Sequence, residues 1–121
     1  MRFMSIITSE QPPRQPTPEL LEAMNKLANQ EIAAGRMLDM GGLMPLAMGA
    51  RVSVVDGKVS VVDGPFVEAK EVIGGYAIFD MQGKDEAVAM AVGFMQLHAD
   101  LMPGWEGTCE VRAFAGPGGP A

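Results

Sequence analysis

Residues 51–64 read RVSVVDGKVSVVDG, in which the block VSVVDG occurs twice. Asp-Gly between two β-branched runs is a strong short-range signal for a hairpin with a two-residue turn. A turn at the first Asp-Gly places Val54 opposite Val59 and Val52 opposite Val61. The repeat is then explained by a hairpin with four valines on one face, which we expect to be its core face, and no duplication need be invoked.

The second Asp-Gly cannot form the same turn, because Pro65 follows it. Proline has no N–H for a continuing ladder, so the chain is predicted to leave the hairpin after Gly64. Asp63 can accept hydrogen bonds from the backbone N–H groups of the next residues, as aspartate does in Asx turns. The hairpin therefore has a predicted beginning, tip and end.

Two helices and four further strands are predicted around this hairpin. The first helix begins with Thr17 as N-cap and Pro18 in its first position, and it ends at Gly35. The second helix spans residues 84–102 and ends at the Pro-Gly that follows. Apolar and β-branched runs predict strands at residues 2–8, 36–43, 76–81 and 108–115.

Glycine pairs interrupt this pattern at two places. Gly41-Gly42 lies inside the second predicted strand and indicates a bulge there. Gly74-Gly75 precedes the strand at 76–81 and fits no nucleotide-binding pattern, so it is interpreted as a bend that admits close approach of another backbone.

The order strand, helix, strand, hairpin, strand, helix, strand is a β-α-β-β-α-β plan with an inserted hairpin. This plan predicts an α+β fold, a ferredoxin-like sandwich. The second helix carries one apolar stripe from Val88 to Met102 and another from Met90 to Leu101. A helix with so wide an apolar surface buries more than one side, and we expect a second subunit to supply the additional cover in a homodimer.

The length and net charge of the chain restrict its domain number and its possible partners. A chain of 121 residues has the size of one domain, expected over residues 1–115 and followed by a flexible Gly/Pro tail at 116–121. Nine basic against fifteen acidic residues give a net charge of −6, so neither nucleic acid nor an anionic membrane surface is expected as a partner. The first residues do not fit a secretory signal, and no segment reaches the roughly 20 apolar residues that cross a bilayer, so we expect a cytoplasmic protein.

The string DGPFVEAKEVIGGY at residues 63–76 resembles the signature of the DGPF-domain branch of the YCII-related proteins. The resemblance runs from residue 2 to residue 112 and includes GGLMP at 41–45 and DGK at 56–58. It implies a ferredoxin-like fold of the dimeric α/β-barrel type, in which the sheets of two subunits meet.

The resemblance implies less about activity. Relatives in the wider YCII group are thought to use a His-Asp pair, some accompany enzymes of aromatic degradation, and DGPF members are often encoded beside sigma factors. This chain departs from that pattern, because its only histidine is His98, late in the second helix. A His-Asp mechanism is therefore not carried over to it.

The densest cluster of polar residues in the sequence lies within the motif at residues 63–76. Asp63, Glu68 and Lys70 are the candidate catalytic residues, since burial that raises a carboxylate pKa toward neutrality suits general acid–base work. The alternative is structural, with Asp63 capping its turn and the other charges forming ion pairs across strands or subunits. Candidate pocket residues are Phe66, Glu71, Tyr76, His98 and Trp105.

No cofactor or metal is predicted. His98 could act as a general base, or as the axial ligand of the haem that some dimeric α/β barrels hold, but a single imidazole among apolar helix residues is more often simply packed. Cys109 is the only cysteine, and its strand context indicates a small buried hydrophobe. One histidine and one cysteine exclude a zinc site with ordinary N and S ligands. The eleven methionines either line an adaptable pocket or, more commonly, fill gaps in a core.

Three hypotheses about function stay open at this point, and with them the question whether the protein is an enzyme. The first is a small-molecule-binding, accessory or regulatory protein with a pocket at the dimer interface. The second is a cofactor-independent lyase or isomerase that acts on a small organic acid. The third is a partner-binding module that acts on a sigma factor.

Overall fold

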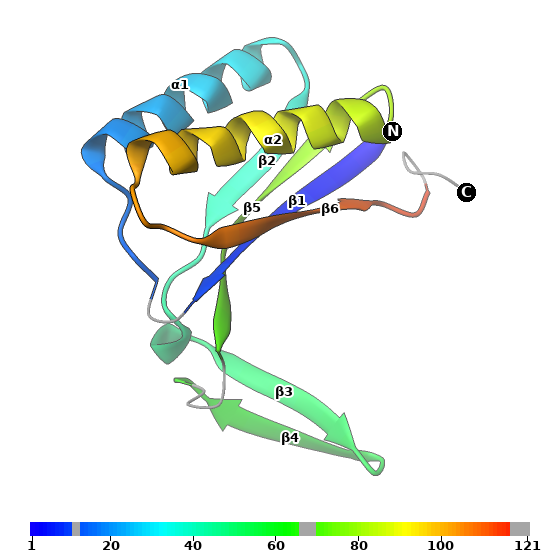
Figure 1. Ribbon diagram of the computed structural model, residues 1–121. Coiled ribbons are helices and arrows are strands. Elements are labelled where there is room, and N and C mark those ends of the chain that lie inside the picture. Colours follow the sequence, from blue (N-terminus) through cyan, green and yellow to red (C-terminus); the bar gives the residue numbers. More distant parts are fainter. Residues whose placement is uncertain (11–12, 66–69, 117–121) are drawn as a thin grey trace.

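The computed structural model of the chain describes residues 1–10, 13–65 and 70–116. It confirms the predicted order of elements and the α+β, ferredoxin-like plan (Figure 1). The elements are β1 (Arg2–Glu10), α1 (Pro18–Ala33), β2 (Met37–Gly42), a short 3-10 turn η1 (Leu46–Met48), β3 (Ala50–Val55), β4 (Lys58–Asp63), β5 (Glu71–Asp80), α2 (Lys84–Leu101) and β6 (Gly107–Ala113). Phe66, Glu68 and residues 117–121 of the predicted tail lie outside the described residues.

Four strands form one antiparallel sheet in the order β2-β5-β1-β6, and both helices cover one face of it (Figure 1). The central pair sets the register, with Ser5 opposite Ala77 and Ile7 opposite Gly75. Because side chains alternate along a strand, Ser5 and Ile7 point to one face and Ile6 points to the other. We call the face with the helices the inner face and the opposite one the outer face.

The first helix begins and ends where its sequence predicts. Thr17 has extended backbone dihedrals, and its hydroxyl accepts a hydrogen bond from the Leu20 N–H at 3.2 Å. Gly35 follows the last turn with a φ of 77°, in the left-handed region that favours glycine. The same Thr17 hydroxyl donates to the Leu101 carbonyl at 2.8 Å, so it also joins the start of α1 to the end of α2.

Tight packing is concentrated toward the two ends of α2. Near its start, Phe3, Phe79, Met81 and Ala87 form a buried cluster between helix and sheet. Near its end, the fully buried side chains are those of Leu20 and Met102. No helix among the described residues is long and apolar enough to span a membrane.

The hairpin β3–β4 forms in the predicted register, with Val54 opposite Val59, and it projects away from the sandwich (Figure 1). Asp56 and Gly57 have φ values of 53° and 76°, which a type I′ turn requires. The expectation of a core face was wrong for the single chain, since the four valines of that face are 63–70% exposed. The reason is that a projecting hairpin meets no second layer among the described residues.

The two glycine pairs behave differently from each other. The bulge predicted at Gly41-Gly42 was wrong, because the register shift of β2 lies between Met37 and Asp39. Gly41 instead makes room for the Tyr76 ring, whose Cε1 would lie 2.9 Å from a Cβ at that position. The bend at Gly74-Gly75 is confirmed as a bulge inside β5, which begins at Glu71 rather than at Tyr76.

Candidate functional site

A cavity of about 650 Å³ lies between the inner face of the sheet and the two helices. Small side chains from both layers create it. On the sheet they come from Ser5, Gly75 and Ala77, and on the helices from the buried Ala28 and Ala91. Pockets for small molecules commonly measure about 300–1,000 Å³, so the space is adequate for an organic ligand.

The remaining wall is mostly apolar and flexible. Six of the eleven methionines contribute to it. Methionine has three rotatable bonds and a polarizable sulfur, so a wall of this kind adapts to ligands of different shape. The six methionines of the lining are Met24, Met37, Met40, Met44, Met90 and Met102.

His98 is the polar side chain best placed to recognise a ligand. It lines the cavity at only 7% exposure, and its Nδ1 lies 3.0 Å from the Phe94 carbonyl oxygen. A carbonyl only accepts hydrogen bonds, so Nδ1 donates to it and Nε2 is the ring nitrogen left for a ligand. Nε2 has no partner among the described residues. Within the described residues, every side-chain N or O atom that is fully buried has a hydrogen-bond partner. Since Nε2 has none, it is not fully buried and remains accessible to a ligand.

Aromatic neighbours fix the imidazole in place. Its ring centroid lies 4.8 Å from that of Phe94 and 4.6 Å from that of Trp105, both with tilted planes. The backbone N–H of Trp105 donates to the Met102 carbonyl at 3.1 Å, which places this residue in the turn just beyond the end of α2. A Cβ at residue 107 would collide with the indole, so Gly107 is needed for this placement. Trp105 thus covers one end of the cavity.

Cys109 and Ser5 form a second polar spot on the lining, on the inner face of the sheet. Burial raises the pKa of the Cys109 thiol, and a hydrogen bond with Ser5 lowers it by a smaller amount. The thiol is therefore neutral at physiological pH and is a poor nucleophile. This agrees with its interpretation as a small, half-buried hydrophobe.

The cavity lining includes Tyr76, but its hydroxyl is already engaged. Tyr76 pairs with Ile6 in the sheet, so its ring points to the outer face and its backbone borders the cavity. The hydroxyl donates to Asp39 Oδ2 at 3.0 Å, and this bond to a carboxylate raises the pKa of the phenol. Tyr76 therefore has a structural role on the outer face.

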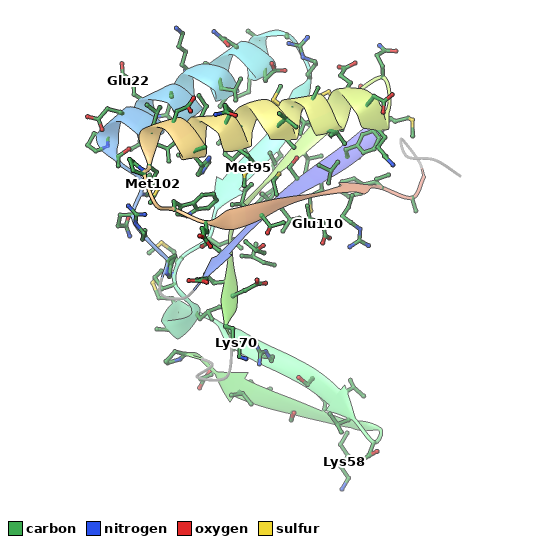
Figure 2. All side chains as sticks on the ribbon, viewed as in Figure 1. Glu22, Lys58, Lys70, Met95, Met102 and Glu110 are labelled. Carbon is green, nitrogen blue, oxygen red and sulfur yellow. The ribbon has the colours of Figure 1, made fainter. Side chains whose placement is uncertain are left out.

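Asp63 and Lys70, the two candidate catalytic residues that the structure describes, are placed elsewhere. Asp63 is exposed at the end of β4. The predicted Asx turn involves Phe66, which lies outside the described residues. Lys70 and Glu71 are exposed where β5 begins. None of the three lines the cavity, and Figure 2 shows Lys70 at the junction of sheet and hairpin, away from Met102 at the end of α2.

The structure thus unites two of the predicted pocket residues, His98 and Trp105, in one site. It adds residues that sequence reasoning missed. Two of them are Ser5 and Ser9, which lie on the same face of β1 as Phe3 and Ile7. Serines at the inward positions of an apolar strand could have indicated a polar spot on the inner face. Arg14, in the irregular segment before α1, offered no such signal.

Comparison with known protein families matches residues 1–101 of the chain to the YCII-related domain. The match covers β1 through α2, and thus both helices and all but the last strand of the sheet. No curated protein matches the sequence. Because the match extends over most of the 121 residues, this chain belongs to the family of YCII-related domains.

Proposed function

We propose that this YCII-related domain binds a small, largely apolar molecule in the cavity between its sheet and its helices. The observation that carries the proposal is His98, a buried imidazole that lines a cavity of about 650 Å³ and whose Nε2 has no partner among the described residues. Ligand sites commonly combine apolar walls with a few such fixed polar groups. Unlike a site on a loop, this one rests on a helix and is braced by two aromatic rings.

Packing supports the proposal independently. Apolar side chains that line an unfilled space forfeit dispersion contacts, and cores normally avoid such loss. Here Ala28 and Ala91 on the helices face small residues on the sheet, so both layers retain the space. A bound apolar molecule would restore the missing contacts and stabilise the fold.

Trp105 provides a direct assay, because it is the only tryptophan and it lies at the cavity. We expect octanamide, which is spectroscopically silent, to change Trp105 emission in a saturable way and to raise the melting temperature. Ten non-hydrogen atoms at roughly −0.5 kcal/mol each suggest a Kd of about 0.2 mM. Absence of saturation up to the solubility limit, with the melting temperature unchanged, would contradict the proposal.

We further propose that two copies of the chain pair through the outer face of the sheet. Three apolar side chains on that face, Met4, Ile6 and Ile78, are only half-buried in the single chain. The hairpin valines are exposed as well, so a partner that covers the sheet and contacts the hairpin would bury both surfaces.

Light scattering after size exclusion should give the mass of a dimer for the wild-type chain. The substitution Ile78→Glu should shift the mass to that of a monomer, because it places a charge at the centre of the proposed interface. Glu22→Gln, on the exposed side of α1, is the control and should leave the mass unchanged. A monomeric wild-type protein would refute the pairing.

We infer that the chain belongs to the DGPF branch of the family, and the motif at residues 63–76 supports this inference. The lyase or isomerase alternative gains no support from the described residues, because Asp63 and Lys70 lie outside the cavity lining. No feature of the described chain favours a sigma factor over other partners. Small-molecule binding is therefore the function that the geometry supports best.

A further inference from the structure

We propose that the natural ligand of the cavity is an apolar organic acid whose carboxylate is bound by Arg14. This inference rests on the proposed function and adds the charge of the ligand to it. Arg14 is the only residue with a full formal charge on the described lining, and no aspartate or glutamate is found there. The chain as a whole has fifteen acidic and nine basic residues, so its net charge is negative, whereas the charge on the described lining is positive.

Arg14 is held in position by backbone and not by an acid. Its Nη1 donates to the Pro103 carbonyl at 3.1 Å, and this solvent-exposed bond places the guanidinium over the turn that follows α2. A Cβ at Gly104 would lie 3.8 Å from Nη1, which places the charged group directly on that turn. The next residue of the turn is Trp105, which covers this end of the cavity.

The charge of Arg14 is not neutralised within the described part of the chain. The ion pairs there join Met1 to Asp80, Arg36 to Glu31 and Arg112 to Glu110, and Arg14 takes part in none of them. A guanidinium has five N–H donors, and the bond to Pro103 uses one. The remaining donors are suited to a carboxylate, which Arg often binds through two parallel hydrogen bonds.

The helix ends nearby do not reverse this preference. The start of α1 bears partial positive charge and the end of α2 partial negative charge, and the bond from Thr17 to Leu101 brings the two ends together. Their effects on a nearby anion therefore offset each other, and Arg14 determines the sign of charge that is favoured. The methionine-rich wall and the two aromatic rings then accommodate an apolar body.

Octanoate and octanamide test the inference, because they share shape and size and differ in charge at neutral pH. In the wild-type protein we expect octanoate to bind about tenfold more tightly, as measured by calorimetry and by Trp105 emission. The substitution Arg14→Gln should abolish the preference, whereas Arg14→Lys should retain most of it. Lys26→Gln removes a charge from the exposed side of α1 and serves as the matched control, with the preference intact.

The outcomes separate the inference from the proposed function. If neither probe binds, the proposed function fails and the inference falls with it. If both bind equally to the wild-type chain, or if Arg14→Gln keeps the preference, the cavity binds small molecules but Arg14 does not select an acid. A preference that is lost with Arg14→Gln and weakens with added salt would establish an electrostatic site at Arg14.

Discussion

Replacing Ala91 by leucine tests whether the space between α2 and the sheet is open in solution. Ala91 is 8% exposed and lines the cavity. Leucine adds three carbon atoms, and each buried CH₂ contributes about 0.8 kcal/mol, which gives at most about 2.4 kcal/mol. Loss of side-chain freedom costs roughly 0.5–1 kcal/mol. A cavity of about 650 Å³ has ample room for three carbons, so Ala91→Leu should stabilise the fold by about 1–2 kcal/mol.

The assay is thermal unfolding followed by circular dichroism, together with the octanamide titration. For a domain of this size, 1 kcal/mol shifts the Tm by roughly 3–6 °C, so we expect the Tm to rise by about 5 °C. Octanamide should bind more weakly, because leucine occupies part of its site. Ala89→Leu, on the exposed side of the same helix, is the matched control and should change stability by less than about 0.5 kcal/mol.

A lower Tm for Ala91→Leu would refute the reasoning. Insertion of carbons into a filled core typically costs about 1–3 kcal/mol, so destabilisation would mean that the helices pack onto the sheet without a cavity. An unchanged octanamide affinity combined with a higher Tm would also count against the site, since the ligand would then bind elsewhere.

Three further predictions concern single contacts. Arg36→Met should lower the urea midpoint of unfolding more than Glu31→Met does, and the opposite order would refute this. Arg36→Met leaves the Glu31 carboxylate, which is 5% exposed, without its ion-pair partner, whereas Glu31→Met leaves an arginine that reaches solvent. Gly107→Ala should displace the indole of Trp105, shift its emission to longer wavelength and weaken octanamide binding, and an unchanged spectrum would count against the packing. The Cys109 thiol should react with Ellman's reagent more slowly in the folded protein than in urea at the same pH, because burial raises its pKa; equal rates would contradict that burial. This raised pKa also contributes stability that is present below the unfolded pKa and is lost as the pH rises through the folded pKa.

Local rules explain what the sequence predicted well. The hairpin turn at Asp56 and Gly57 and the helix start at Thr17 depend on residues within a few positions of each other, and the structure has both. The cavity depends on the register of strands that are distant in the chain. That Ser5 faces Ala77 is decided by the pairing of β1 with β5, which no local pattern contains.

Asp63 and Lys70 of the motif lie outside the cavity lining, whereas Val72 to Tyr76 at the end of the same motif are part of it. Asp63 and Lys70 are both exposed. His98 is an isolated histidine on an apolar helix, and its contacts with Phe94 and Trp105 arise only when the turn after α2 folds back.

The Thr17 hydroxyl serves both helices at once. It accepts from the Leu20 amide and donates to the Leu101 carbonyl. Loss of this one oxygen atom would therefore remove both the cap of α1 and the bond that joins the start of α1 to the end of α2.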